Sequence, residues 1–231
     1  VATCSGAAAV LKRKPDAIIP HGVDPETYKL PANGKKEEWS SLGYPGEYGI
    51  GIFARIRAQK GIGILVDAMI PIMKDDPAPT VLIAGETTKS HEGFVKELKE
   101  KIKNEGLENR IILLGKIHYD NEVPKLMRGL SIVTALSTIE GFGLPVLEAM
   151  ASGCAVVASR TGAWEDIIEE NVHGKLVPCN DTEAAHIALK ELTENHMNLE
   201  KMGLKGRDRV NGHFTIESEA KSLLQLYRSQ N

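Results

Sequence analysis

The feature that most constrains the fold is an alternation, from residue 48 onward, of short apolar runs with amphipathic helical patterns. Strands that alternate with helices in this way form a parallel sheet with crossover helices on its faces. The runs that we expect to be strands are residues 48–54, 80–84, 110–114, 131–136, 155–159 and 175–177. The sequence therefore predicts an α/β fold, with functional loops at the carboxyl ends of the strands.

Between these runs, apolar residues recur at three-to-four spacing, as Ile62, Leu65 and Met69 do, which predicts helices with one buried face. A short helix is expected over 145–152, because proline suits a first helical turn and a glycine follows. From residue 181 to the end we expect helix, broken at residues 211 and 212 before a last amphipathic helix. Residues 1–47 are punctuated by proline and glycine, which is typical of a linker preceded by the tail of another unit.

Composition excludes several classes of protein. Hydrophobic residues make up 42% and charged residues 26%, as in a globular protein with a large core. A net charge of -3 gives no electrostatic footprint for nucleic acid. Three scattered cysteines favour a reducing, cytoplasmic setting over a disulfide framework, and no apolar run is long enough to span a membrane.

The strongest motif is residues 140–148, Glu-Gly-Phe-Gly-Leu-Pro-Val-Leu-Glu, which follow one expected strand and run into a helix. Two glycines let the backbone approach a ligand, and the start of a helix offers free N–H groups to phosphate. Because Pro145 has no N–H, Gly143 and Leu144 are the expected donors.

The two glutamates of this motif are candidates for binding sugar hydroxyls, because an ionised carboxylate only accepts hydrogen bonds. We place Glu148 in the first helical turn, where it would bind the vicinal hydroxyls of a ribose. Glu140, on the loop, would bind hydroxyls of a second ring. The alternative is that Glu140 is solvated and Glu148 only complements the dipole of its own helix.

A second cluster, Arg55, Arg57 and Lys60, follows the first expected strand and precedes Gly61. Cations at the end of a strand can neutralise a diphosphate, with a bidentate arginine and a lysine acting as a point charge. A solvated surface loop is the alternative interpretation.

Two further strand ends add candidate contacts. Gly85 would leave room for a ligand, and backbone groups near Lys116 and Ile117 would read the edge of a base. Turn geometry explains the glycine equally well. No histidine pattern is typical of a metal site, and Gly61-Ile-Gly63 does not extend into a dinucleotide-binding fingerprint. We therefore expect no metal and no cofactor.

Taken in order, these segments resemble glycosyltransferase family 4, retaining enzymes of the GT-B fold whose pattern has two glutamates separated by seven residues. The segments that carry the resemblance are residues 20–24, 53–61, 83–85, 114–115, 140–153, 162–165 and 174–177. The sequence departs from the family at Ala54, where a glycine is usual, and at Trp164, where a proline is frequent.

The resemblance implies that the sheet is the Rossmann-like, C-terminal half of a GT-B enzyme. Residues 1–30 would be the tail of the acceptor-binding domain and the interdomain linker. Residues 31–213 would form the nucleotide-sugar-binding domain. Residues 214–231 would contain a C-terminal helix that packs toward the missing N-terminal domain.

The resemblance also implies roles for the candidate residues. Arg55 and Lys60 would hold the donor diphosphate, Glu148 the ribose and Glu140 the transferred sugar, while Phe142 and the two residues after it would offer backbone groups. Arg55, Lys60 and Glu140 would be the catalytic residues.

The linker, residues 53–60 and the helix around residue 69 look most similar to bacterial lipopolysaccharide core mannosyltransferases. This likeness implies GDP-mannose as the donor, with a UDP-sugar as the alternative, and a glycan or glycolipid acceptor. The parent would be cytoplasmic, and peripheral at the inner face of the membrane if the acceptor is a lipid. Other reactions stay open: a GT-B epimerase, a phosphorylase, or a non-catalytic nucleotide-binding domain.

Overall fold

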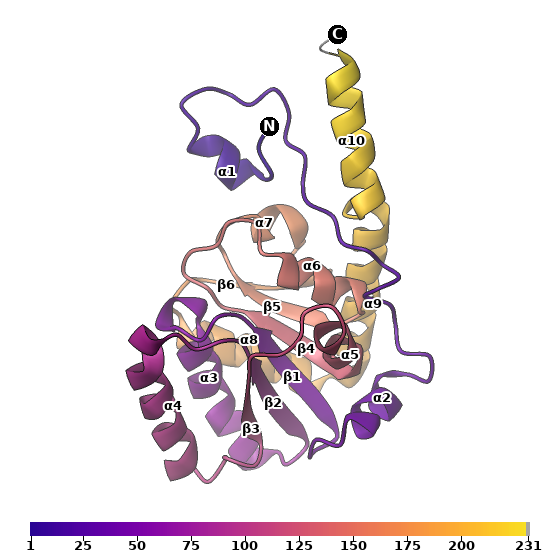
Figure 1. The fold of residues 1–231 in the computed structure, drawn as a ribbon. Coiled ribbons are helices and arrows are strands. Elements are labelled where there is room, and N and C mark those ends of the chain that lie inside the picture. Colours follow the sequence, from indigo (N-terminus) through magenta and orange to yellow (C-terminus); the bar gives the residue numbers. More distant parts are fainter. Residues whose placement is uncertain (230–231) are drawn as a thin grey trace.

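The computed structural model describes residues 1–229 and contains a six-stranded parallel sheet, with strand order β3-β2-β1-β4-β5-β6 (Figure 1). The strands are β1 (Tyr48–Phe53), β2 (Pro79–Ala84), β3 (Ile111–Gly115), β4 (Leu130–Ala135), β5 (Ala155–Ser159) and β6 (Gly174–Val177). Each begins and ends within one residue of an expected strand. The predicted α/β class and the parallel sheet are therefore confirmed.

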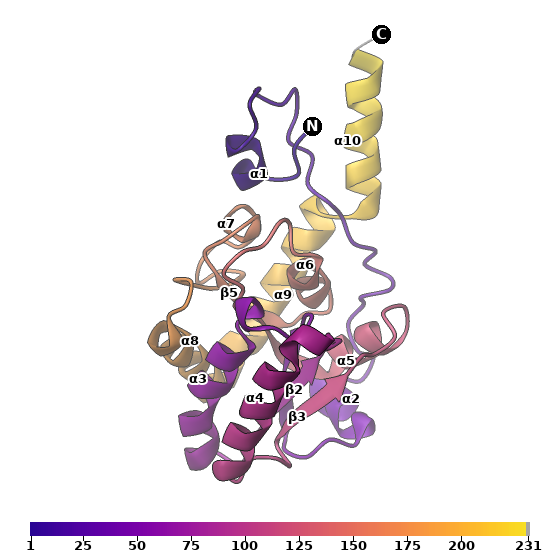
Figure 2. The same cartoon turned by 60° about the vertical axis from the view of Figure 1, so that its left-hand side comes forward.

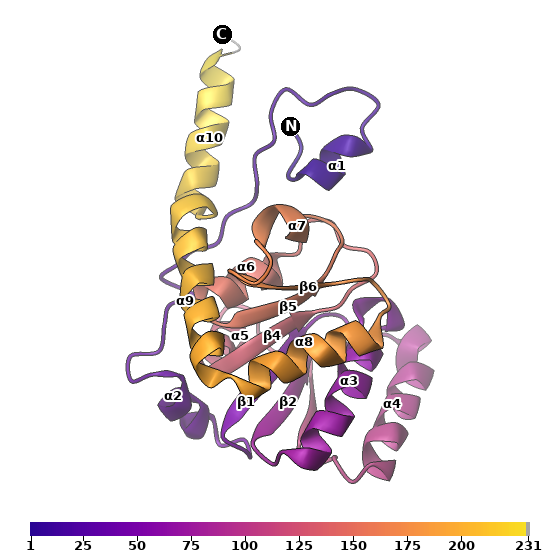
Figure 3. The same cartoon turned by 180° about the vertical axis from the view of Figure 1, so that it is seen from behind.

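Helices cover both faces of the sheet. One face carries α3 (Ile62–Asp75), α4 (Glu92–Asn104) and α8 (Thr182–Glu194), which lie in front of the strands in Figure 3. The other carries α2 (Lys35–Leu42), α5 (Glu122–Gly129) and α6 (Leu144–Ala151). Short elements complete the domain: α1 (Ser5–Ala9), α7 (Trp164–Ile167), and single turns of 3-10 helix at Ala58–Lys60 and Lys89–His91.

The two faces have separate hydrophobic cores. The three-to-four spacing in α3 places Ile62, Leu65 and Met69 in the first core, each without exposed surface. Helix α9 (His196–His213) joins the two cores, because its N-terminal half contributes Leu199 to the first and its C-terminal half contributes Val210 to the second.

Two expectations about helices were wrong. The break expected at Asn211 and Gly212 lies instead at Phe214, which is buried and ends α9. The glycine is tolerated within a helix because its cost there is only about 1 kcal/mol. Residues 35–42, interpreted as part of a linker, form helix α2, whose Trp39 is 1% exposed. The lysines and glutamates of this segment favour helix, Gly43 ends it in the left-handed conformation, and burial of Trp39 holds it against the sheet.

The last helix, α10 (Ile216–Ser229), extends away from the sheet (Figures 1 and 2), and none of its residues is buried. Residues 230 and 231, which belong to the predicted C-terminal helix, lie outside the described residues. Among residues 1–229 there is no helix that combines the length and the apolar character needed to cross a bilayer.

The strand order fixes where a ligand can bind. The order reverses between β1 and β4, which are neighbours in the sheet although 76 residues lie between them in the sequence.

 
Those 76 residues, 54–129, form β2, β3 and the crossover helices that return the chain to the far side of β1. In open parallel sheets, ligands bind outside the carboxyl ends of the strands at such a reversal. The loops that follow β1 and β4 therefore flank the expected binding crevice.

Candidate functional site

The loops after β1 and β4 meet at the reversal of strand order. The Lys60 ammonium lies 2.6 Å from Oε2 of Glu140, and the backbone N–H of Thr138 donates to the Gln59 carbonyl oxygen over 2.9 Å. The side chains of Lys60 and Glu140 are only 14% and 21% exposed. The cationic turn and the acidic glycine loop therefore form one site, as the sequence predicts.

Gly61 allows the two loops to approach. It ends the single 3-10 turn before α3 with φ of +71°, a left-handed conformation that favours glycine. A Cβ at this position would overlap the Leu136 carbonyl group at the end of β4. Any larger residue would therefore push the turn carrying Lys60 away from the loop carrying Glu140.

The crevice between these loops is a cavity of about 340 Å³. The cavity is lined by Ile52, Phe53, Ala54, Arg55, Lys60, Thr134, Ala135, Ser137, Glu140, Gly143, Leu144, Pro145 and Trp164. Five predicted site residues line it, namely Arg55, Lys60, Glu140, Gly143 and Leu144. The cavity joins two cations, a carboxylate and the start of α6, which together suit a ligand with both anionic groups and hydroxyls.

Gly143 is the N-cap of α6, with φ of +81°. A Cβ there would overlap the indole of Trp164, whose Nε1 lies 3.5 Å from the Gly143 carbonyl oxygen. Pro145 is the second residue of α6 rather than the first, since the helix begins at Leu144. The indole packed against this turn is a lining residue that sequence reasoning did not select, although Trp164 was noted as a departure from the family pattern.

Glu148 does not lie in the first turn of α6, as expected, but one turn further on, and it is 1% exposed. The alternative interpretation, that Glu148 only complements the dipole of its own helix, is therefore wrong. Burial raises the pKa of this carboxyl, and hydrogen bonds from Tyr119 and Tyr28 partly oppose that rise. The Tyr119 hydroxyl donates to Oε1, whereas Oε2 is buried without a partner among the described residues. A buried, unpaired acceptor of this kind suits a ligand hydroxyl.

Sequence reasoning missed both tyrosines. Tyr119 follows the strand end at Lys116 and Ile117, so its position after β3 was an available signal. Burial raises the pKa of the Tyr119 hydroxyl to about 12. Tyr28 lies in a segment interpreted as linker, and its place beside Glu148 depends on the path of the folded chain.

The other predicted residues lie outside the cavity lining. Phe142 is 8% exposed and packs in the second core, against which Ile117 also packs. The Lys116 ammonium is exposed and lies 3.5 Å from the Glu86 carboxylate. A Cβ on Gly85 would overlap the Ala54 carbonyl oxygen, so the close approach of the ends of β1 and β2 accounts for this glycine.

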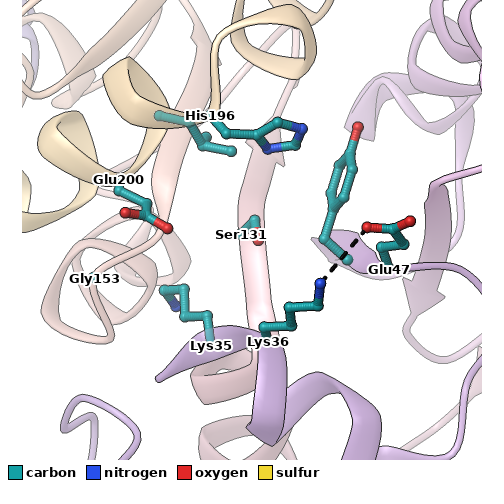
Figure 4. Close-up of a pocket in the computed structure, with 9 residues that line it drawn as sticks. Lys35, Lys36, Glu47, Ser131, Gly153, His196 and Glu200 are labelled. Atoms are coloured by element: carbon teal, nitrogen blue, oxygen red, sulfur yellow. Dashed lines mark ion pairs between the residues drawn. The ribbon is translucent and has the colours of Figure 1, made fainter. Parts of the chain in front are cut away.

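A different cavity, of about 270 Å³, lies at the amino ends of β1 and β4 (Figure 4). There Lys36 forms an ion pair with Glu47, and the His196 ring packs edge-on against Tyr48. The Lys35 ammonium is already bound, since it donates to the carbonyl oxygens of Leu130 and Ser152 over 2.6 and 2.9 Å. No predicted site residue lines this cavity, which is at the opposite edge of the sheet from Lys60 and Glu140.

The fold and the crevice define the class of protein: a Rossmann-like α/β domain with a charged ligand site at the carboxyl edge of its sheet. The sequence model of glycosyl transferases group 1 matches residues 35–209. The chain therefore belongs to the group 1 glycosyltransferases, as the resemblance implied.

Known relatives agree with this assignment. The chain is 33% identical, over 99% of its length, to the lipopolysaccharide core biosynthesis mannosyltransferase LpsB of Rhizobium meliloti, of which it spans 65%. It is 40% identical to the C-terminal domain of a group 1 glycosyltransferase (LpcC) from Francisella tularensis, with a TM-score of 0.80 over 84% of this chain and all of that domain. Anabaena HepE, solved with UDP, is 26% identical with a TM-score of 0.83, over 92% of this chain and 57% of HepE.

Proposed function

We propose that this chain is the donor-binding domain of a retaining glycosyltransferase that transfers mannose from GDP-mannose. The observation that carries the proposal is the convergence of Lys60 and Glu140, at 2.6 Å, in the crevice at the reversal of strand order. The likeness to a protein named as a lipopolysaccharide core mannosyltransferase supports both the choice of sugar and a role in core biosynthesis.

In the proposed complex, Arg55 and Lys60 hold the diphosphate beside the N–H groups of Gly143 and Leu144. Glu140 binds hydroxyls of the transferred sugar, and Glu148 binds the ribose through its unpaired Oε2. Backbone groups of Gly85, Lys116, Ile117 and Phe142 complete the donor contacts. The lining of the cavity by both cations and by the start of α6 supports this arrangement.

The proposed chemistry breaks the bond between the anomeric carbon and the diphosphate oxygen. The oxygen of an acceptor hydroxyl forms the new bond on the same face of the sugar, and its proton passes to the departing diphosphate. The transition state has oxocarbenium character, and negative charge develops on the departing diphosphate. Arg55 and Lys60 stabilise that charge from fixed positions, and loss of one such group costs about 10²- to 10³-fold in rate at comparable sites.

The proposal extends to the parent protein. The chain spans 65% of LpsB, which is consistent with an additional acceptor-binding domain in the parent. Residues 1–30 would join that domain to this one, and α10 would pack against it. We propose that the acceptor is a glycan or glycolipid and that the parent acts in the cytoplasm at the inner face of the membrane.

The test is calorimetric titration of this chain with GDP-mannose and UDP-glucose. GDP-mannose is expected to bind, and Arg55→Ala and Glu148→Ala should each weaken binding by about tenfold or more, since a hydrogen bond to a charged group contributes roughly 1.5–3 kcal/mol. Lys36→Ala, a charge loss at the opposite edge of the sheet, is the matched control. Preference for the UDP-sugar would correct the donor, and the absence of binding to either would refute the proposed function.

A further inference from the structure

The interdomain linker, helix α10 and the loop of residues 140–143, called the donor loop here, meet at His21. His21 Nδ1 lies 2.9 Å from Oε1 of Glu219 in α10, and the Gly22 N–H donates to Oε2 of the same carboxylate over 2.8 Å. The His21 ring also packs edge-on against Phe142, with ring centroids 5.0 Å apart and an interplanar angle of 85°. His21 therefore connects three segments that are distant in the sequence.

Backbone hydrogen bonds hold the linker beside the start of α10. Val23 donates to the Phe214 carbonyl oxygen over 2.9 Å and accepts from the N–H of Ile216 over 3.1 Å, so the linker pairs with the junction of α9 and α10. Figure 3 shows the linker passing beside that junction. A Cβ at Gly22 would overlap the backbone of Thr215, so this approach excludes a larger residue. His21 is thus presented to Phe142 from a rigid support.

Phe142, in contrast, lies in a loop with intrinsic freedom, because glycines flank it at 141 and 143. Its buried ring is one of the contacts that hold the loop, and His21 packs against that ring. The same loop carries Glu140, which pairs with Lys60, and the Gly143 cap of α6. Displacement of the Phe142 ring would therefore move the groups that face the cavity.

We propose that His21 is a positioning residue: held by Glu219, its ring fixes Phe142 and thereby the donor loop, so that the linker and α10 set the geometry of the donor site. The inference rests on the proposed function. Movement of the linker or of α10 would reach the donor loop through this ring, although neither segment would contact the ligand.

The two contacts of His21 can be separated by substitution. His21→Phe keeps a ring against Phe142 and loses the bond to Glu219, whereas His21→Ala loses both. Glu217→Gln, two residues from Glu219 on the same helix, is the control for a lost carboxylate. An edge-to-face aromatic pair corresponds to about a 2- to 12-fold change in a dissociation constant. We expect His21→Ala to weaken GDP-mannose binding by this factor, and His21→Phe to restore most of it.

A second readout needs no ligand. The chain has two tryptophans, of which Trp164 contacts Gly143 in the donor loop and Trp39 is buried beside α5. After incorporation of 5-fluorotryptophan, fluorine NMR of His21→Ala should show a shifted Trp164 resonance and an unchanged Trp39 resonance, and His21→Phe should return Trp164 toward its original position. Glu217→Gln should move neither.

The outcomes separate the inference from the proposed function. An unmoved Trp164 resonance in His21→Ala, or equal shifts in His21→Ala and His21→Phe, would overturn the positioning role whatever the chain binds. A wild-type chain that binds no nucleotide sugar, but whose Trp164 resonance follows the ring at position 21, would refute the proposed function and support the coupling.

Discussion

At the scale of single residues, the buried carboxyl of Glu148 lowers the stability of the free domain and leaves one oxygen available to a ligand. Its carboxyl is 1% exposed, and one of its oxygens has no partner among the described residues. Burial raises its pKa because the charged form loses hydration. A charged group with an unsatisfied oxygen lowers the stability of the free domain, which is typical of a group retained for binding.

We predict that Glu148→Gln raises stability at pH 7 and weakens donor binding. Because the folded pKa lies above the unfolded value, the folded state binds the proton more tightly, and the unfolding free energy falls as pH rises from the unfolded toward the folded pKa. The glutamine removes that fall while leaving an oxygen for Tyr119. Thermal unfolding should show a gain of about 1 kcal/mol at pH 7, roughly 2–4 °C, and a flatter pH profile, with Glu217→Gln unchanged. A lower midpoint with an unaltered pH profile would contradict the argument.

Substitution of Lys60, which pairs with Glu140, should lower stability, whereas substitution of Glu148 should raise it. Lys60→Met leaves a mostly buried carboxylate without its cation, so we expect a loss of about 1 kcal/mol in unfolding free energy and weaker binding of GDP-mannose. Adding Glu140→Gln should recover the stability and leave binding weak. A double-mutant cycle measured by chemical denaturation and calorimetry checks both effects. Additive losses of stability would show that the two groups do not interact.

At the scale of elements, the two glycines between β4 and α6 differ in how much a side chain at each would destabilise the fold. Gly143 has φ of +81° and no room for a Cβ beside Trp164, whereas a Cβ on Gly141 meets no atom within 4 Å. We predict that Gly143→Ala costs about 2–5 kcal/mol from backbone strain and overpacking, and that Gly141→Ala changes stability by less than about 0.5 kcal/mol. Urea denaturation compares the two. Equal effects would mean that the turn relaxes around a side chain.

The elements that the sequence predicts well are those specified by local pattern. Each strand is a mostly apolar run, so its bounds follow within one residue from the residues alone. The true end of α9 depends on the distant packing of Phe214, which no local pattern contains, whereas α2 has local helix formers and was obscured by the prolines and glycines around it.

The same distinction holds at the candidate site. The convergence of Lys60 with Glu140 follows from strand order and loop position, so sequence reasoning could reach it. The approach of Tyr28 to Glu148 follows from the path of residues 1–47 across the fold, so it could not, whereas the place of Tyr119 after β3 was an available signal.

At the scale of the whole molecule, the sheet and its two cores form the stable unit, and α10 adds little to them. None of the residues of α10 is buried, and Ile216, Leu224 and Tyr227 are more than half exposed. Phe214, immediately before it, is 8% exposed and belongs to the second core. The boundary between the stable unit and the extension should therefore lie between Phe214 and Ile216.

Truncation tests that boundary. A chain ending at Thr215 should keep its thermal midpoint within about 2–4 °C, because it loses no buried side chain, although it loses the Glu219 carboxylate. A chain ending at His213 also loses Phe214 and should be destabilised by about 3–5 kcal/mol, as when a buried phenylalanine is reduced to alanine. The two chains differ by only two residues, and calorimetry compares their stabilities. If both lose the same stability, α10 belongs to the folding unit, and the boundary lies elsewhere.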